Sequence, residues 1–570
     1  MAEFVSSQGG RETEIPTRLE YFQGTVWQGV RAVSRRYPSL IAFDFMGKST
    51  SYASFEQNVL RCANALREMG VRPSDRVLIC LPNCPQAVEL FYAVNAIGAI
   101  SVMVHPLSGE KEIEFYLKDS GSAVAVTLDS FYGKFASLWE RTPLRRLVVT
   151  SVADALPPLK AFGYQLTAGR KTEKIPQSEW VLRWDSFLGN GTCGEISAVG
   201  ESRDPAVILY SGGTTGTAKG ILLSNGNFNA LAQQIVATNP SFRPGDKMLA
   251  VMPVFHGFGL GVCIHSMLFN GGRCLLVPRF TVKSYAKLLK KSKCNFIAGV
   301  PTLYEALLRE SSVRNANLSS LKGVYSGGDS LSVSLKKRLD AFLTDHGSSV
   351  PVREGYGTTE CVTASCLTPP NRYKEGSIGL PFPDTFYKIV RPESEEELPF
   401  GQDGEICLSG PTVMLGYWNR PEENRQVLRI HADGRTWVHT GDLGAMDEEG
   451  FVYFRQRLKR VIVTNGYNVY PSQIENALEA LPQVALSCVI GLPDPLRGQR
   501  VKAFVVLSSG ISATEETRKV LLSALEKAVA KYALPKEIEF RTSLPKTPVG
   551  KVAYRMLEEE EQQKYRVNNP

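Results

Sequence analysis

Short β-branched and apolar runs alternate with longer amphipathic stretches between residues 50 and 330. A short run of this kind predicts a strand, and apolar residues that recur every three or four positions predict a helix. Helices are expected over Ala53–Met69 and Ser284–Lys291. Strands are expected over Val77–Leu81, Ser101–Val104, Ala123–Thr127, Leu147–Thr150, Ala206–Tyr210, Met248–Met252, Cys274–Val277, Phe296–Gly299 and Gly323–Tyr325. The alternation predicts βαβ units, and therefore an α/β fold with mostly parallel sheets.

The pattern changes after residue 400, where short strands and turns predict a small β subdomain. Its strands are expected over Gly404–Ser409, Trp437–Thr440 and Phe451–Phe454. A compact tail follows, with strands over Val461–Thr464, Val484–Ile490, Val501–Val506 and Glu537–Phe540 and helices from Pro471 and over Glu515–Tyr532. We therefore expect a large N-terminal domain, residues 1–456, and a small α+β C-terminal domain, residues 457–570. Residues 153–200 show few signals and are interpreted as an excursion from the fold or a linker, and the polar end 558–564 is interpreted as a low-complexity tail.

The composition is that of a folded globular protein. A chain of 570 residues exceeds what one core supports, so two or more domains are expected. The 65 basic and 57 acidic residues leave a net charge of +8, which suits an anionic ligand. This charge is too diffuse for a nucleic-acid partner, because the sequence has no block of basic residues.

The eleven cysteines include no CxxC pair and predict reduced core thiols. The most apolar run, Phe91–Val104, is interrupted by polar residues and glycine and is shorter than a membrane span. No basic and apolar signal segment is visible at the start of the sequence. We therefore expect a cytoplasmic protein, a monomer or homodimer, with at most peripheral membrane contact.

A loop rich in glycine, serine and threonine, "SGGTTGTAKG", follows the strand at Ala206–Tyr210. Its glycines allow backbone N–H groups to turn inward on an anion, its hydroxyls add donors, and Lys219 adds a positive charge. This combination favours phosphate binding over the alternative, an ordinary mobile surface loop. Ala218 stands where a Walker loop requires glycine, which argues against a phosphotransferase of that type.

Four further motifs supply the other parts of a nucleotide site. The stretch "REGYGTTE" offers Tyr356 as a ring on which a base stacks and Glu360 as a carboxylate for a metal. "HTGDLG" offers Asp442, a carboxylate in a predicted tight turn that suits ribose hydroxyls. "QRLKR" offers Arg457, and "PVGK" offers Lys551 in a Pro-rich loop. Each motif alone has an ordinary structural explanation, but together they predict an ATP site.

In order and spacing these motifs resemble the acyl-adenylate-forming superfamily, which includes acyl-CoA synthetases, 4-coumarate–CoA ligases, firefly luciferase and peptide-synthetase adenylation domains. The similarity extends from about residue 25 to 557. Within the family the chain looks most like bacterial medium- or long-chain fatty-acid–CoA ligases. The resemblance implies ATP and Mg²⁺ as cofactors, coenzyme A as co-substrate, and a C-terminal domain that rotates between two half-reactions.

The resemblance also implies a role for individual residues. ATP would be held by Ser211, Gly212, Gly213, Thr214, Thr215, Gly216, Lys219, Gly328, Glu354, Gly355, Tyr356, Gly357, Thr358, Thr359, Asp442 and Arg457. Thr214, Lys219, Glu360 and Lys551 would be the catalytic residues, with Glu360 and Thr214 as metal ligands. Lys459 matches the hinge, and Gly466 with Tyr467 lies in the loop implied to line the CoA channel.

His256 and the small residues after it, in "PVFHGFGLGV", predict the acyl pocket, although a buried core histidine is the alternative. The expected pocket residues are His256, Phe258, Gly259 and Gly327. Small residues leave room for a long apolar chain, so a fatty acid is favoured, while an aryl or steroid acid stays open.

The sequence departs from the family pattern at Ala218, at Ser224-Asn225 and at Arg460, which leaves the subgroup open but removes no catalytic group. The expected reaction is therefore activation of a carboxylic acid by ATP and transfer to CoA. Transfer to a carrier protein, a luciferase-like oxygenation and a non-enzymatic acyl-AMP-binding protein are the alternatives.

Overall fold

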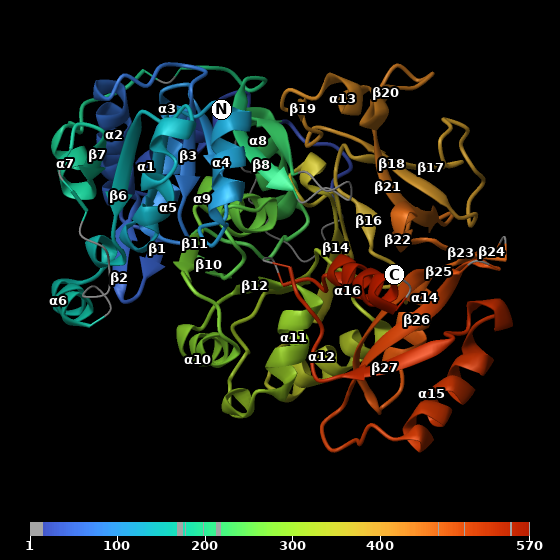
Figure 1. Cartoon of the computed structure of the whole chain (residues 1–570). Helices are drawn as coiled ribbons and strands as arrows, with labels where there is room; N and C mark the ends of the chain where they lie inside the picture. Colours follow the sequence, from blue (N-terminus) through green and yellow to red (C-terminus); the bar gives the residue numbers. More distant parts are fainter. Residues whose placement is uncertain are drawn as a thin grey trace, which may run out of the picture.

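The computed structural model describes residues 15–167, 175–176, 178–197, 199–211, 218–465, 467–494, 496–547 and 550–568. Figure 1 shows two large sheets with their helices in blue to green, a β subdomain in yellow to orange, and the C-terminal elements in orange to red beside them. Among the helices that the structure describes, none combines the length and apolar character needed to span a bilayer.

The first large sheet has eight strands, and its central strands are parallel. In spatial order they are β19 (Gly416–Tyr417), β9 (Lys219–Ser224), β8 (Pro205–Ser211), β4 (Ile100–Met103), β3 (Arg76–Cys80), β5 (Val124–Leu128), β6 (Arg146–Thr150) and β7 (Val181–Arg183). The strands β9 and β19 are antiparallel additions at one edge. This edge carries the loop between β8 and β9, so the predicted phosphate loop joins two paired strands.

The second large sheet has nine strands. In spatial order they are β16 (Leu380–Pro381), β15 (Cys366–Leu367), β14 (Val352–Tyr356), β13 (Gly323–Ser326), β12 (Phe296–Gly299), β10 (Lys247–Ala250), β11 (Arg273–Leu276), β1 (Ile41–Phe45) and β2 (Lys48–Ser51). The six strands from β14 to β1 are parallel. The nine strands that the sequence predicts in this half of the chain are present within two residues of their expected bounds, which confirms the α/β fold class.

Helices cover and separate these two sheets (Figure 1). They are α1 (Val26–Arg36), α2 (Tyr52–Glu68), α3 (Pro85–Ala96), α4 (Glu110–Ser120), α5 (Tyr132–Ala136), α6 (Pro158–Leu166), α7 (Trp184–Gly189), α8 (Asn225–Ala237), α9 (Ser266–Phe269), α10 (Val282–Ser292), α11 (Pro301–Arg309) and α12 (Val333–Asp345). Every residue of α3 is buried, and its side chains share one core with β3 and β10 of the two sheets. A helix that is apolar all round belongs to such an interior position.

Residues 153–200 are more ordered than the sequence predicts. Helix α6, strand β7 and helix α7 lie in this region, and β7 extends the first sheet by pairing with β6. The interpretation as a linker is therefore wrong for the described part. The strand was missed because β7 has three residues, too few for a periodic signal.

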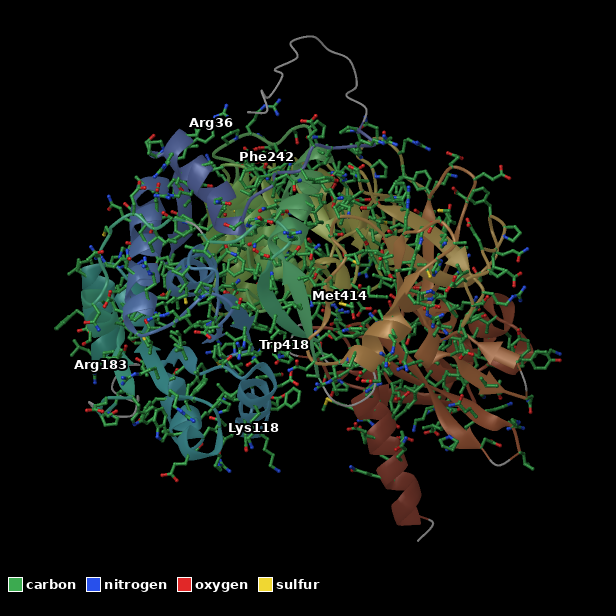
Figure 2. All side chains as sticks on the ribbon, turned by 90° about the horizontal axis from the view of Figure 1, so that it is seen from above. Arg36, Lys118, Arg183, Phe242, Met414 and Trp418 are labelled. Atoms are coloured by element: carbon green, nitrogen blue, oxygen red, sulfur yellow. The ribbon has the colours of Figure 1, made fainter. Side chains whose placement is uncertain are left out.

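The β subdomain consists of β17 (Phe386–Val390), β18 (Gly404–Ser409), β21 (Thr436–Met446), β20 (Leu428–Ile430) and β22 (Val452–Arg457), with helix α13 (Pro421–Val427). It is attached to the first sheet next to β19, where Trp418 Nε1 donates to the carbonyl of Asp119 over 3.0 Å and Arg420 pairs with the Asp119 carboxylate at 2.8 Å. Figure 2 labels Met414 and Trp418 at this junction between the green and orange parts.

The C-terminal domain has its own sheet and core. Its strands are β24 (Tyr467–Val469), β23 (Ile462–Thr464), β26 (Gly498–Leu507), β25 (Val484–Asp494) and β27 (Glu537–Arg541), and its helices are α14 (Pro471–Glu479), α15 (Glu515–Ala528) and α16 (Tyr554–Asn568). Buried apolar side chains of α14, α15 and β26 form a cluster separate from the main core. We propose residue 457 as the domain boundary because it ends β22.

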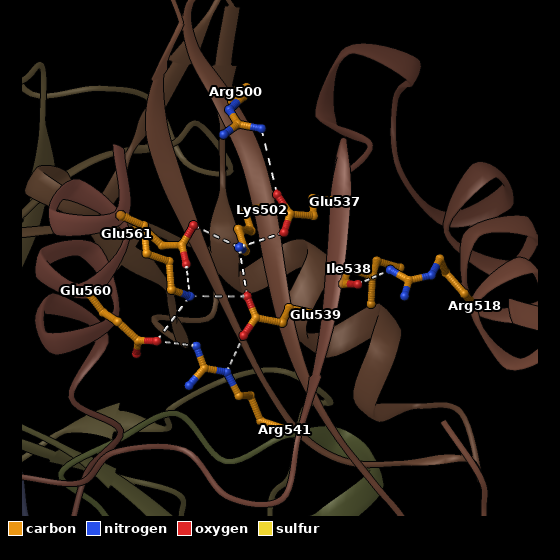
Figure 3. A network of polar contacts seen from close by, with 10 residues as sticks. Arg500, Lys502, Arg518, Glu537, Ile538, Glu539, Arg541, Glu560 and Glu561 are labelled. Carbon is orange, nitrogen blue, oxygen red and sulfur yellow. Dashed lines mark hydrogen bonds and ion pairs between the residues drawn. The ribbon is translucent and has the colours of Figure 1, made fainter. Parts of the chain in front are cut away.

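Helix α16 corrects the interpretation of the chain's end as a low-complexity tail. The stretch of glutamates 558–561 lies on this helix. Figure 3 shows how the helix is held: the ammonium of Lys502, on β26, lies 2.7 Å from Glu537, 2.8 Å from Glu539 and 2.8 Å from Glu561 of α16. Arg541 adds an ion pair of 2.6 Å to Glu560. The sequence pattern could not predict this arrangement, because the glutamates gain their positively charged partners, Lys502 and Arg541, only from other strands of the folded domain.

We predict that Lys502→Met destabilises the C-terminal domain. The Lys502 side chain is 3% exposed, and its loss would leave carboxylates facing one another without their shared cation. Removing one partner of a buried ion pair costs about 3–5 kcal/mol. Calorimetric unfolding should show the C-terminal transition at a markedly lower temperature. Arg391→Met is the control, since its pair with Glu396 is exposed and worth at most about 1 kcal/mol. Equal effects of both variants would contradict the prediction.

Candidate active site

A cleft of about 1900 Å³ lies between the N-terminal part and the C-terminal domain. The predicted residues that line it are Ser211, Lys219, His256, Gly328, Glu354, Gly355, Tyr356, Gly357, Thr358, Thr359, Glu360, Asp442, Arg457, Lys459 and Lys551. They come from strands β8, β9, β14, β21 and β22, from the segments that follow β10, β13, β14 and β22, and from the segment before α16. The fold therefore gathers motifs that are more than 300 residues apart in the sequence.

The phosphate loop connects β8 to β9. Ser211 and Lys219 face each other as the last cross-strand pair of this hairpin. The predicted ATP-binding residues Gly212, Gly213, Thr214, Thr215 and Gly216 lie outside the described residues, and so does the predicted metal ligand Thr214. The Lys219 ammonium lies 4.9 Å from the centre of the Tyr417 ring, at the mouth of the loop.

Glu360 has a fixed orientation. It follows β14 in a 3-10 turn, Thr359–Cys361, and its Oε1 accepts a 2.8 Å hydrogen bond from the hydroxyl of Tyr417. Tyr417 thus contacts both Glu360 and Lys219, and the sequence interpretation missed it because tyrosine carries no motif of its own there. No hydrogen-bond donor of the described residues reaches the second oxygen of Glu360, which suits a Mg²⁺ ion that prefers carboxylate and phosphate oxygens.

A tight turn packs under this motif. Val362 and Thr363 adopt φ values of 52° and 75°, a left-handed conformation that is unusual for β-branched residues. A Cβ on Gly357 would collide with the carbonyl of Thr363, and one on Gly257 would collide with its hydroxyl. Gly357, the second glycine in "GYGTTE", is therefore required by backbone packing. Strained backbone of this kind is concentrated at functional sites.

Tyr356, Asp442 and Arg457 form one group. The Tyr356 hydroxyl donates to Asp442 Oδ2 over 2.7 Å, and Arg457 Nε lies 3.1 Å from Asp442 Oδ1 across the β21–β22 pair. Asp442 is 1% exposed, and burial raises its pKa against the opposing effect of the Arg457 charge. Oδ1 accepts no hydrogen bond from the described residues, and the Arg457 guanidinium beside it balances its charge.

Asp442 lies inside the long strand β21, not in the tight turn that the sequence predicts. Gly441 before it has a φ of 67°, and the pairing with β22 shifts register just after it. A bulge of this kind re-aims a side chain. The tight-turn prediction is wrong because a bulged strand and a turn use the same residue types.

Glu354 is one of the predicted ATP-binding residues that line the cleft. Its Oε1 accepts a hydrogen bond of 3.0 Å from the N–H of Leu331. Burial raises the pKa of Glu354 to about 8, so the side chain is protonated at neutral pH. Gly328, which also lines the cleft, has a φ of 82°, a conformation that favours glycine.

Lys551 reaches this cleft from the C-terminal domain. A Cβ placed on Gly328 would lie 3.5 Å from Lys551 Cε, so the lysine side chain passes directly over this glycine. Its loop is held by a hydrogen bond of 2.8 Å from the Thr302 hydroxyl to the carbonyl of Gly550. Burial lowers the pKa of Lys551, and the carboxylates of Asp329 and Asp442 counteract that effect. Asp329 was not predicted, because only the fold brings it near Lys551.

His256 lines the cleft as predicted rather than the closed core. Its Nδ1 accepts a hydrogen bond of 3.2 Å from the N–H of Phe258. Burial, and then the charge of Lys551, lowers the pKa of His256 to about 3. The imidazole is therefore neutral at physiological pH and does not compete with Lys551 for an anionic substrate group.

A narrow apolar cavity of about 40 Å³ lies behind Gly327 and Gly328. Its lining includes Phe258, Val262, Gly327, Leu367 and Phe382, so two of the predicted acyl-pocket residues are present. Phe258 and Val262 belong to a π-helix, Phe258–His265, a form that is frequent at functional sites.

Gly259 is not in the lining of this cavity. A Cβ there would collide with the carbonyl groups of Met252 and Pro253. The structure therefore contradicts the prediction that Gly259 provides space for the acyl chain, and gives it a packing role instead. Small residues in a sequence do not distinguish room for a ligand from close backbone contact.

The hinge and CoA residues lie differently from the ATP residues. Lys459 is in the 3-10 turn Leu458–Arg460 and lines the cleft. Gly466 lies outside the described residues. Tyr467 is 56% exposed and stacks on Tyr532 with ring centres 4.7 Å apart, and it is absent from the described cleft lining.

The departures from the family pattern have structural partners. Arg460 Nη2 lies 2.6 Å from Glu475 of α14, so the basic residue after the hinge is bound to the C-terminal domain. Ser224 caps α8, and Asn225 accepts a hydrogen bond of 3.1 Å from the N–H of Val26. These residues act in packing and leave the cleft groups in place.

Comparison with known proteins agrees with this geometry. Residues 30–418 match the model of the AMP-binding enzyme family and residues 473–551 match the AMP-binding enzyme C-terminal domain. The chain therefore belongs to the AMP-binding enzyme family, which confirms the resemblance drawn from its motifs.

Individual relatives narrow the comparison. A long-chain-fatty-acid–CoA ligase of Bacillus subtilis is 36% identical over 97% of this chain and 98% of its own length. A feruloyl-CoA synthase of Amycolatopsis is 31% identical over 91% of this chain and 95% of its own. MatB of Rhodopseudomonas palustris, 26% identical over 94% of this chain and 99% of its own, matches with a TM-score of 0.81 when ATP is bound and 0.71 in its apo form. This structure therefore superposes better on the ATP-bound MatB structure than on the apo structure.

We predict that Asp442→Asn weakens ATP binding by losing its hydrogen bonds to ribose. Hydrogen bonds to a charged group contribute about 1.5–3 kcal/mol, which corresponds to about 10–150-fold in affinity. Calorimetric titration should show this loss for ATP. The wild-type protein should bind 2′,3′-dideoxy-ATP as weakly as the variant binds ATP, and the variant should no longer distinguish the two nucleotides. Discrimination equal to wild type would contradict the ribose role.

Proposed function

We propose that the protein activates a carboxylic acid with ATP to an acyl-AMP and transfers the acyl group to CoA. The observation that carries the proposal is the position of Lys551. Its side chain passes over Gly328, which also lines the apolar cavity, and the charges of Asp442 and Arg457 act on its ammonium group. A cation between a nucleotide subsite and an apolar pocket suits a reaction that joins a carboxylate to a phosphate.

The first half-reaction replaces a poor leaving group. A carboxylate oxygen attacks the α-phosphorus of ATP, the bond to the β-phosphate oxygen breaks, and pyrophosphate leaves. Such a reaction depends mainly on positioning and on neutralising charge. Asp442 would hold the ribose, Thr359 the α-phosphate, and Lys551 the charge shared by carboxylate and α-phosphate. Mg²⁺, when held by Glu360, would neutralise phosphate charge.

The second half-reaction forms the thioester. The sulfur of CoA attacks the acyl carbon, the bond to AMP breaks, and the thiol proton is lost. We propose that the C-terminal domain rotates about Lys459 between the two steps. Tyr467 is exposed while Lys551 is in the cleft, so the loop proposed to line the CoA channel would replace Lys551 after rotation.

The acid is proposed to be a medium- or long-chain fatty acid. The full-length similarity to long-chain-fatty-acid–CoA ligases and the mostly apolar lining of the cavity support this choice. The feruloyl-CoA synthase relative makes an aryl acid the second candidate. Transfer to a carrier protein instead of CoA is the alternative second step. Pyrophosphate release with acetate, octanoate, palmitate, benzoate and coumarate, each with CoA, tests the proposal, and no release with any acid would overturn it.

The two half-reactions should separate in variants. Lys551→Ala removes a preorganised donor and should slow acyl-AMP formation about 10²–10³-fold. It should spare thioester formation from supplied acyl-AMP, because Lys551 is then outside the cleft. Lys459→Pro fixes φ near −65° and should have the opposite effect, since the hinge can no longer turn. Single-turnover kinetics of each step is the measurement.

Lys536→Ala is the control for both variants, because this exposed lysine of the same domain lies outside the described cleft lining. It should leave both steps unchanged. Equal losses in both half-reactions for Lys551→Ala and Lys459→Pro would contradict the rotation of the domain.

Bulk in the apolar cavity should change the accepted acid. Val262→Trp should shift the preference toward shorter acids, and Val262→Ala should not reduce the chain length of the preferred acid. Gly259→Ala should instead lower the thermal unfolding temperature, since overpacking costs about 1–3 kcal/mol, with no change in the chain-length profile. Activity over C4–C18 acids and thermal unfolding check these expectations. A Val262→Trp profile identical to wild type would place the chain elsewhere.

A further inference from the structure

A group of buried metal-binding side chains lies in the β subdomain, apart from the proposed magnesium site. A carboxylate oxygen of Glu405, the sulfur of Cys407 and a ring nitrogen of His439 lie within 4.8 Å of one another, and all three residues are buried. Glu405 and Cys407 are two residues apart on β18, and Cys407 faces His439 across the β18–β21 pair. The sheet therefore places three ligand types at one point.

The distance between two of these ligand atoms is close to that in a tetrahedral zinc site. His439 Nδ1 lies 3.0 Å from Glu405 Oε2. Oxygen and nitrogen ligands lie about 2.0–2.2 Å from zinc, so two of them are about 3.3 Å apart at a tetrahedral angle. A small relaxation would therefore let a cation replace the proton between these two atoms. Cysteine sulfur and histidine nitrogen select zinc over magnesium or calcium, which take oxygen ligands.

The surroundings would orient the ligands. His431 Nε2 lies 3.0 Å from His439 Nε2, and His431 is buried against Trp437. The other oxygen of Glu405, Oε1, accepts a hydrogen bond of 3.0 Å from the N–H of Gly441. A metal-bound histidine normally donates its second ring N–H to a partner, and coordinating carboxylates are themselves hydrogen-bonded. Both partners are in place.

We propose that Glu405, Cys407 and His439 bind a zinc ion, with His431 accepting the hydrogen bond that orients His439. Three protein ligands leave one position for water, and the site has no assigned role in the ligase reaction. The proposed site is linked to Asp442, because Glu405 accepts a hydrogen bond from the N–H of Gly441, the residue before Asp442. Zinc would thus fix the strand that presents the ribose carboxylate. The proposal stands independently of the proposed function.

The local charge is compatible with a divalent ion. A Cys407 thiolate and the Glu405 carboxylate together balance the two charges of zinc. Two positively charged residues, Lys388 and Arg429, are near enough to act on Cys407. The Lys388 ammonium lies 4.1 Å from the centre of the Trp437 ring and 4.0 Å from the carboxylate of Asp433. Burial, and then Glu405, raises the pKa of the Cys407 thiol, so binding must release its proton.

Cobalt substitution of the full-length protein tests the site. After removal of metals with a chelator, titration with Co²⁺ should give one equivalent of tetrahedral cobalt with a thiolate-to-cobalt charge-transfer band, and Zn²⁺ should displace it. Cys407→Ser should abolish the charge-transfer band. His431→Gln should weaken Co²⁺ binding about 10–100-fold while keeping the band, as expected for an orienting partner.

Cys193→Ser is the matched control, because Cys193 is the exposed cysteine and a source of adventitious binding. It should change neither stoichiometry nor spectrum. X-ray absorption of the zinc-loaded wild type, which needs no variant to fold, should show one sulfur with nitrogen and oxygen ligands. Substoichiometric binding, a spectrum without sulfur, or a band that persists in Cys407→Ser would overturn the proposal and leave the group as a hydrogen-bonded network.

Discussion

The burial of one ammonium group, that of Lys551, sets the conditions for the rest of the site. A cation in a protein interior is unfavourable unless opposite charges face it. Here Asp329 and Asp442 face it, and the burial still lowers its pKa. An anion bound in the cleft would relieve that imbalance. The lysine therefore favours the closed arrangement of the two domains most strongly when a nucleotide and a carboxylate are present.

The C-terminal domain holds Lys551 in position through the elements next to it in the chain. Helix α16 begins three residues after Lys551 and is held to the sheet by Lys502 and Arg541 through Glu561 and Glu560. The contact between Thr302 and Gly550 then joins the lysine loop to the N-terminal part. A second hydrogen bond, from the Ser472 hydroxyl to the carbonyl of Arg455, also joins the C-terminal domain to the N-terminal part.

Asp442, also in the cleft lining, has two carboxylate oxygens and three groups that interact or are proposed to interact with them. Tyr356 occupies one oxygen, Arg457 lies beside the other, and a ribose is proposed to take the place that remains. The bulge at Gly441 and the bond from its N–H to Glu405 fix this carboxylate. The same strand thus carries the proposed ribose contact and, three residues before it, the proposed zinc ligand His439.

The sequence by itself determined the fold class, nine strands of the two large sheets and the identity of the cleft motifs, because periodicity and glycine-rich loops are local properties of the chain. It also placed His256 and Gly327 correctly beside the cleft and the cavity. Only the tertiary structure decided that Gly259 packs against Pro253, that the glutamates of the chain's end form α16, and that Asp442 lies in a bulged strand. The reason is physical: whether a small residue leaves space, or a charge finds a partner, depends on atoms contributed by distant parts of the chain.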